Sequence, residues 1–181
     1  MLRASLLPLL MVATASWATD SPNPHALAAI ANVATPAPNI ISAGRLQASD
    51  IATIANSGVR HVIDLTTEAE PKDFDEGETV LRAGMQYHRL PINGGNDLTA
   101  ANVARFDQLL RDIGSVPTLV HCASSNRVGA LAALRAGWIQ GLSVDAAIDE
   151  GKRWGLQGLE PTVRERLLAA KAAENATKPI Q

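Results

Sequence analysis

The chain has 181 residues, which is enough for one domain with a sizeable core and too few for two ordinary ones. Apolar residues make up 46% and charged residues 19%, a balance that excludes wholesale disorder and burial in a membrane. The formal net charge is −2 and no cluster of Lys and Arg marks a nucleic-acid footprint, so we expect no nucleic-acid partner.

The first 18 residues depart from this average composition. Arg3 precedes an apolar stretch from Leu6 to Ala15, and Ser16-Trp17-Ala18 has small residues at both positions that a signal peptidase inspects. An uncleaved anchor is the alternative, but the apolar run is shorter than a bilayer crossing and contains Pro8. Residues 1–18 are therefore predicted to be a signal peptide, and the mature protein to be periplasmic or secreted without stable membrane insertion.

Composition divides the rest of the chain into three parts. Residues 19–38 are rich in Pro and Ala and are interpreted as a tether with at most one or two helical turns. Residues 39–175 form the expected catalytic domain, and residues 176–181 a tail.

Strand-like and helix-like patterns alternate through the catalytic domain. In chain order, the sequence predicts a strand (40–42), a helix (46–55) closed by Gly58, a buried strand (59–65), an acidic surface loop (66–75), a helix (77–83), a strand (85–92), a Gly-rich loop (93–97), a helix capped by Thr99, a central strand (117–120), a helix (127–141), and two helices opened by Ser143 and Pro161. This alternation predicts an α/β fold with a mainly parallel central sheet flanked by helices.

The stretch from Val120 to Gly129 carries the chemistry. It combines the end of a strand, a short polar turn and the start of a helix, where backbone N–H groups and the helix dipole bind anions. Cys122 lies at the mouth of that turn, and the same field together with Arg127 favours the thiolate, the nucleophilic form. Arg127 can also hold two oxygens of a phosphate in a bidentate manner.

Cys122 is the only cysteine of the sequence, so it forms no disulfide within the chain. A lone cysteine after a core strand is often an inert packing residue. Here the surrounding pattern favours a functional thiol, with His121 in a supporting role. The intervening residues are small or polar and leave room for an anion against the backbone; they are Ala123, Ser124, Ser125 and Asn126.

These motifs resemble those of a known family. His121-Cys122 with Arg127-Val128-Gly129, preceded by Ile41-Ser42-Ala43-Gly44, Val62-Ile63-Asp64-Leu65 and Leu90-Pro91-Ile92, is similar to the bacterial phosphatase-like domain of the tyrosine and dual-specificity phosphatase superfamily. That domain also occurs joined to metallo-β-lactamase-like hydrolases and is sometimes labelled a sulfurtransferase. The resemblance implies hydrolysis of a phosphate monoester, such as phosphotyrosine or another phosphoprotein, by a cysteinyl-phosphate mechanism with no metal and no cofactor. It also implies a four-stranded or five-stranded sheet.

The loop departs from the family pattern at one point. Four residues separate Cys122 from Arg127, whereas the usual phosphatase loop has five. Four is also the spacing of rhodanese-type sulfurtransferase loops, whose smaller cradle suits a persulfide. Sulfur transfer through a Cys122 persulfide therefore stays open as an alternative, as does a non-catalytic module that binds an anionic ligand or partner.

A phosphatase also needs an acid that protonates the leaving oxygen. In the resembling enzymes an Asp follows the strand that corresponds to Leu90-Pro91-Ile92, and the nearest carboxylate here is Asp97. Asp97 is the predicted acid, although a solvated cap of the following helix is the competing interpretation. Three other acidic residues are alternatives, namely Asp64, Glu68 and Glu70.

Overall fold

The central sheet orders the whole domain. The computed structural model describes residues 23–177, and its five strands lie in the order β1-β2-β5-β3-β4. Only β1 and β2 pair in an antiparallel manner, and the other neighbours are parallel. The strands are β1 (Ala34–Ala37), β2 (Ile40–Ala43), β3 (His61–Asp64), β4 (Gln86–Arg89) and β5 (Thr118–His121).

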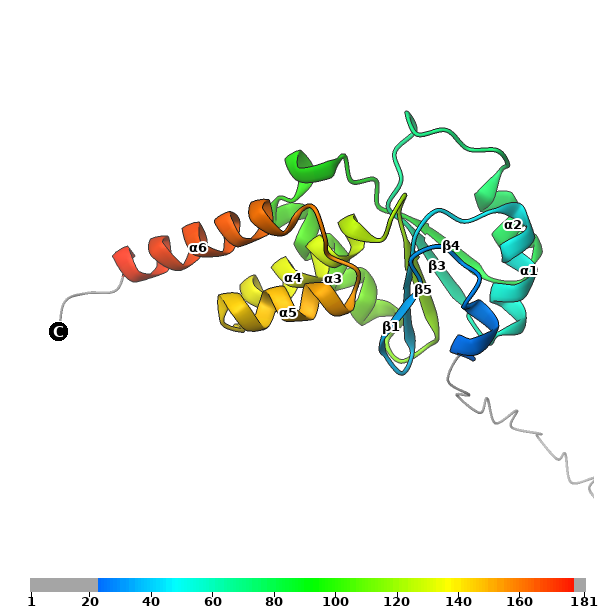
Figure 1. Cartoon of the computed structure of the whole chain (residues 1–181), viewed down its shortest axis with the longest axis horizontal. Coiled ribbons are helices and arrows are strands. Elements are labelled where there is room, and N and C mark those ends of the chain that lie inside the picture. Colours follow the sequence, from blue (N-terminus) through cyan, green and yellow to red (C-terminus); the bar gives the residue numbers. More distant parts are fainter. Residues whose placement is uncertain (1–22, 178–181) are drawn as a thin grey trace, which may run out of the picture.

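Helices cover both faces of this sheet (Figure 1). The α-helices are α1 (Ala48–Asn56), α2 (Glu76–Arg82), α3 (Ala100–Ile113), α4 (Asn126–Trp138), α5 (Val144–Arg153) and α6 (Glu160–Thr177), and two short 3-10 helices are η1 (Pro24–Leu27) and η2 (Gly94–Asp97). Helices α1 and α2 lie on one face, and α3 to α6 lie on the other. The predicted α/β class with a mainly parallel sheet is confirmed.

Two hydrophobic cores correspond to the two faces. The larger core joins α3, α4, α5 and α6 to the sheet, with Phe106 and Trp154 in an edge-to-face contact at 6.3 Å. The smaller core lies under α1 and α2. Successive residues of the central strand point to opposite faces of the sheet, so Leu119 packs in the smaller core and Val120 in the larger one.

Several predicted boundaries follow from identifiable caps. The Thr99 hydroxyl accepts a hydrogen bond from the Asn102 N–H at the start of α3, and the Ser143 hydroxyl accepts one from Ala146 at the start of α5. Gly58 has a φ of 100°, which an L side chain rarely adopts, and it ends the turn after α1. These helix starts and this stop are confirmed.

The segment interpreted as a tether is partly structured. It contains η1 and β1, and Leu27 and Ile30 are buried in the smaller core. Antiparallel pairing of β1 with β2 extends the sheet by one strand. The Pro and Ala content concealed this strand, because four residues are too few to show an alternating pattern.

The predicted signal peptide, residues 1–18, lies outside the described residues. Within residues 23–177, no helix has both the length and the apolar character needed to cross a membrane.

Candidate active site

The candidate site lies where β5 meets α4. β5 ends at His121 and α4 begins at Asn126, so Cys122 to Ser125 form the turn between them. β5 is the central strand, and its neighbours β2 and β3 place Ala43 and Asp64 level with His121. The Cys122 N–H donates to the Ala43 carbonyl at 3.3 Å. Cys122 therefore lies at the carboxyl edge of a parallel sheet, where ligand sites of α/β proteins form.

The segment between α5 and α6 braces the turn from outside. Ser125 adopts a left-handed conformation, with φ of 63°, and its hydroxyl donates to the Trp154 carbonyl at 3.0 Å. Asn126 Oδ1 accepts hydrogen bonds from the N–H groups of Gln157 and Leu159, at 2.9 and 3.3 Å. A left-handed non-glycine residue costs about 1–3 kcal/mol and persists only where its surroundings fix it, as these three bonds do.

Arg127 is held by a carboxylate from the loop after β3. Its Nη1 and Nη2 donate to Oε1 and Oε2 of Glu70, at 2.6 and 2.7 Å, in a bidentate pair. Nη1 also donates to the carbonyls of Leu65 and Ile92, at 3.3 and 2.8 Å. A guanidinium has five N–H groups, and these bonds leave the Nε–H and the second Nη2–H for a thiolate or an oxyanion. Glu70 thus orients one edge of Arg127 and leaves the other for ligand.

Electrostatics support the same arrangement. Burial alone would lower the pKa of Arg127, but hydrogen bonding to Glu70 and interaction with Cys122 outweigh it and raise that pKa. Hydrogen bonds from Arg127 hold the pKa of Glu70 below its usual value against the opposing effect of burial. Arg45 adds a second cation, with its Nη2 3.7 Å from Glu70 Oε2. Glu70 is therefore an ionised anchor for Arg127 rather than a proton donor.

A cavity of about 430 Å³ lies over Arg127. The turn contributes Ser124 and Asn126 to its walls, and the loop after β3 contributes Thr67 and Glu70. Cys122 itself has no exposed surface. A ligand in the cavity therefore reaches the sulfur only if the turn or a neighbouring loop shifts.

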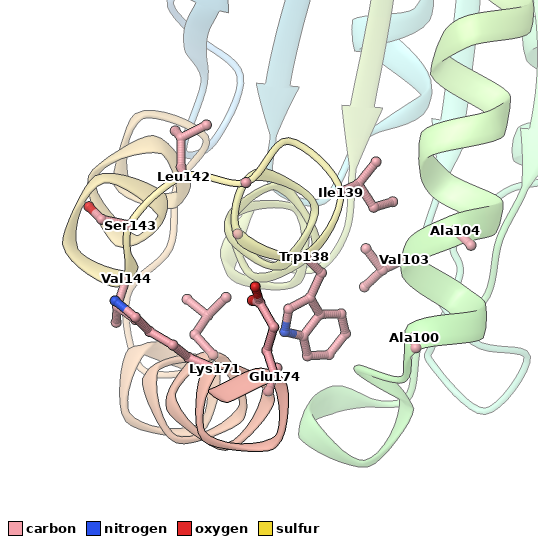
Figure 2. A pocket seen from close by; sticks show the side chains of 14 residues that line it. Ala100, Val103, Ala104, Trp138, Ile139, Leu142, Ser143, Val144, Lys171 and Glu174 are labelled. Atoms are coloured by element: carbon pink, nitrogen blue, oxygen red, sulfur yellow. The ribbon is translucent and has the colours of Figure 1, made fainter. Parts of the chain in front are cut away.

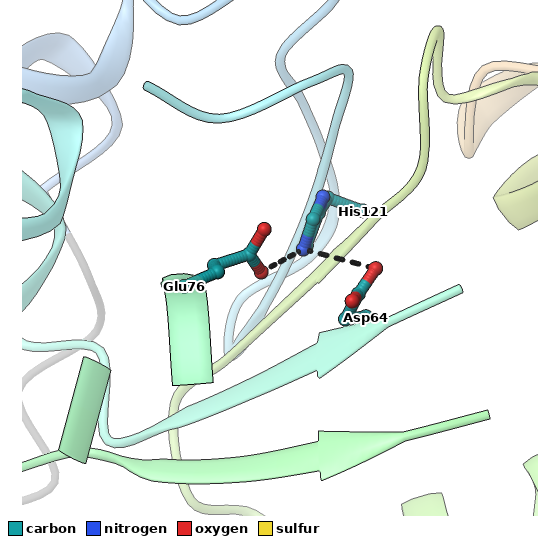
Figure 3. A group of neighbouring side chains, drawn as sticks. All are labelled: Asp64, Glu76 and His121. Atoms are coloured by element: carbon teal, nitrogen blue, oxygen red, sulfur yellow. Dashed lines mark hydrogen bonds and ion pairs between the residues drawn. The ribbon is translucent and has the colours of Figure 1, made fainter. Parts of the chain in front are cut away.

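Behind the turn lies a buried polar cluster (Figure 3). His121 Nε2 is 2.6 Å from Glu76 Oε1 and 3.6 Å from Asp64 Oδ1, and the three side chains are buried. One ligand-type atom from each lies within 4.8 Å of the others. Asp64 Oδ2 also accepts hydrogen bonds from Lys72 Nζ and the Tyr87 hydroxyl, at 2.8 and 2.7 Å. Because these carboxylates already have hydrogen-bond partners, the cluster is better suited to supporting His121 than to binding a metal ion.

The charge state of Asp64 agrees with that role. Burial would raise the pKa of Asp64, but His121 and hydrogen bonds from Lys72, Thr66 and Tyr87 lower it to about 2. Burial and the hydrogen bond to Asp64 raise the pKa of Tyr87. Asp64 is thus a permanent carboxylate near neutral pH, which makes it a poor general acid.

The other acid candidates lie in different surroundings. Asp97 belongs to η2, is half-buried, and accepts a hydrogen bond from the Asn93 N–H at 2.9 Å through Oδ2. Asn93 and Gly94 line the cavity, which places Asp97 on the loop that forms one of its walls. Glu68 is exposed and pairs with Arg89. Asp97 in the acid role stays a prediction.

A larger groove, of about 770 Å³, lies at the opposite end of α4 (Figure 2). Trp138 and Ile139 at the end of α4, Val103 of α3 and Leu167 of α6 line it. α4 has 13 residues, so the groove is about 18 Å along the helix axis from the turn that carries Cys122. None of the predicted site residues lines this groove.

The sequence motif predicts the turn but not the side chains that support it. From the sequence, Glu70 is only an alternative acid, and Glu76, Lys72 and Tyr87 have no assigned role. Pairing of β3 beside β5 brings the loop after β3 against the turn, so the order of the strands would have indicated the contact between Glu70 and Arg127.

Known structures share this architecture. A crystal structure of a candidate phosphatase (DUF442) from Shewanella putrefaciens CN-32 superposes with a TM-score of 0.66 at 22% identity, covering 82% of this chain and 98% of the other. A candidate phosphatase from Neisseria meningitidis z2491 gives a TM-score of 0.64 at 24% identity, with 77% and 98% covered. TpbA of P. aeruginosa, a cysteine-to-serine variant in complex with phosphotyrosine, gives 0.57 at 20% identity, with 88% and 99% covered.

These similarities define the fold of the chain, which is that of the cysteine-dependent tyrosine and dual-specificity phosphatases. No protein-family model matches the sequence, and no curated protein matches it. The fold by itself does not assign an activity.

Proposed function

We propose that the protein is a cysteine-dependent phosphatase that hydrolyses a phosphate monoester. The observation that carries the proposal is the turn between β5 and α4, where Cys122 precedes a helix start and Arg127 is oriented by Glu70. A fixed guanidinium beside a nucleophile suits a transition state that spreads negative charge over three phosphoryl oxygens.

The proposed reaction has two displacements. The Cys122 thiolate attacks phosphorus while the bond to the leaving oxygen breaks, and Asp97 gives its proton to that oxygen. Water then attacks the cysteinyl phosphate and gives a proton to the Asp97 carboxylate, the S–P bond breaks, and orthophosphate leaves with the thiolate and the acid restored. Arg127 and the backbone N–H groups of the turn stabilise the equatorial oxygens in both steps.

Turnover of p-nitrophenyl phosphate by the purified protein tests the proposal. We expect hydrolysis that vanadate inhibits. If the purified protein is folded by circular dichroism and shows no phosphatase activity at any pH assayed, the proposal is contradicted. Binding of phosphate without turnover would instead support the non-catalytic module.

Sulfur transfer is a second candidate, favoured by the four residues between Cys122 and Arg127. An outer persulfide sulfur is one atom held by backbone N–H groups, whereas a phosphoryl group needs two parallel donors from Arg127. Arg127→Lys should therefore cost a phosphatase about 2–4 kcal/mol of transition-state stabilisation and cost a sulfurtransferase little. Efficient transfer of sulfur from thiosulfate to cyanide, with aryl phosphates untouched, would select the second candidate.

A further inference from the structure

Most of the residues that line the cavity over Arg127 have polar side chains. Hydroxyl and amide side chains line it from three separate segments, and these are Thr67 in the loop after β3, Asn93 before η2, and Ser124 and Asn126 in the turn. Leu159 is the one large apolar residue among the described residues that line it. No aromatic side chain is among those lining residues.

Such walls suit a hydroxylated ligand better than an aromatic ring. Pockets for flat apolar groups are lined mainly by hydrophobic and aromatic side chains. A phenyl ring placed here would strip water from amides and hydroxyls without replacing their hydrogen bonds, at a cost of about 1–3 kcal/mol for each group left unpaired. A ligand with several hydroxyls would restore those bonds.

The hydrogen-bonding roles of two wall residues are already partly set. The Thr67 hydroxyl donates to Glu70 Oε1 at 3.3 Å, so towards a ligand it acts as an acceptor. Asn126 Oδ1 accepts from Gln157 and Leu159, so its amide NH₂ group is the part that can serve a ligand, as a donor. A hydroxyl group both donates and accepts, and it can therefore satisfy both residues.

We propose that the substrate is the phosphate ester of a polyhydroxylated alcohol, such as a sugar or a polyol, with the phosphate on Arg127 and the hydroxyls on the amide and hydroxyl walls. This inference rests on the proposed phosphatase function and names the substrate class of the same site. Phosphotyrosine, which the TpbA complex contains, is the contrasting class.

Binding to the Cys122→Ser variant tests the proposal, because an inactive protein removes the influence of the leaving group. Isothermal titration calorimetry would compare glucose 6-phosphate with phosphoserine and phosphotyrosine. We expect glucose 6-phosphate to bind about tenfold more tightly than either, the effect of one or two net hydrogen bonds. Phosphoserine isolates the hydroxyls, since it shares the alkyl phosphate and lacks the polyol.

Asn93→Ala in the same background should reduce the preference for glucose 6-phosphate over phosphoserine several-fold. Asn96→Ala is the matched control, because Asn96 is an exposed residue of the same loop that does not line the cavity. Vesicles that contain phosphatidylinositol 4-phosphate provide a further arm, which separates a lipid head group from a soluble polyol phosphate as the source.

Phosphotyrosine binding as tight as, or tighter than, glucose 6-phosphate would overturn the substrate class while leaving the phosphatase proposal intact. An unchanged preference in Asn93→Ala would also overturn it. If none of the three esters binds, orthophosphate does not bind, and the wild-type protein hydrolyses no p-nitrophenyl phosphate, the proposed function itself fails.

Discussion

Glu70 is the residue on which the geometry of the site most depends after Cys122 and Arg127. Its carboxylate is the bidentate partner of Arg127, and Thr67 donates to it through both its N–H and its hydroxyl. A charged hydrogen bond of this kind contributes about 1.5–3 kcal/mol. The loop after β3 is thereby part of the proposed active site.

Replacing Glu70 should leave Arg127 in place but weaken the contact that orients its guanidinium. Glu70→Gln keeps one acceptor oxygen and loses the ion pair, so we expect kcat/KM for p-nitrophenyl phosphate to fall about 10- to 100-fold, the equivalent of 1.5–3 kcal/mol. Glu68→Gln is the control, because Glu68 pairs with Arg89 instead. Increased activity in Glu70→Gln would show that Glu70 competes with substrate for Arg127.

Replacing Asp97 by Asn tests its acid role without removing its hydrogen bond to the loop. In Asp97→Asn the side-chain oxygen can still accept from the Asn93 N–H, so the loop should keep its shape. If Asp97 is the acid, the variant should slow esters with poor leaving groups far more than esters with good ones. A series of substituted phenyl phosphates measures this, and equal slowing across the series would remove Asp97 from the role.

At the scale of elements, the packing of α4 against the segment that follows α5 fixes the turn. Only glycine fits at position 129, because a Cβ there would lie 2.1 Å from the Leu156 nitrogen and 2.7 Å from the Gly151 carbonyl oxygen. The segment from Trp154 to Leu159 can therefore lie close enough to bond Ser125 and Asn126.

Gly129→Ala should push this segment away from α4. Overpacking against backbone atoms costs about 1–3 kcal/mol, and we expect a lower melting temperature together with reduced phosphatase activity. Gly158→Ala is the matched control within the same segment, since its Cβ would make only an ordinary contact of 3.7 Å with Asn126. Equal melting temperatures for Gly129→Ala and the wild-type protein would contradict this account of the packing.

The sequence predicted elements best where a local pattern was complete. The strand that ends at His121, the helix that begins beyond the turn, and the caps Thr99 and Ser143 each depend on neighbouring residues. β1 has only four residues, too few to show a pattern of its own. The partners of Arg127 and His121 lie far away in the chain, as does Glu70, which is 57 residues from Arg127. No local periodicity reports such contacts, and only the order of the strands brings them together.

At the scale of the whole molecule, the titration of two histidines makes stability depend on pH. His61 of β3 and His88 of β4 stack, with Nδ1 of the first 2.9 Å from Nε2 of the second. Burial, and then the charge of His88, lower the pKa of His61, and burial lowers the pKa of His88. The folded state therefore favours neutral rings and binds fewer protons than the unfolded chain just below the ordinary histidine pKa of about 6.5.

The lowered pKa values make the folded state less stable at acid pH. The stabilisation is fully present above about pH 6.5 and is lost as the pH falls through the ordinary pKa towards the lowered ones. We expect the free energy of unfolding in urea to decrease between about pH 7 and pH 5 and the decrease to shrink in His88→Gln. His25→Gln, at an exposed histidine, should leave the slope unchanged. A slope that is the same in all three proteins would exclude the His61–His88 pair as its cause.

The central claim is that Cys122 forms a covalent bond to phosphorus. Rapid acid quenching of the wild-type protein during turnover of p-nitrophenyl phosphate, followed by peptide mass spectrometry, tests it most directly. We expect one phosphoryl group on the peptide that contains Cys122, and neither adduct nor turnover in Cys122→Ser. Turnover that is undiminished in Cys122→Ser, or a phosphoryl group on a different residue, would contradict it.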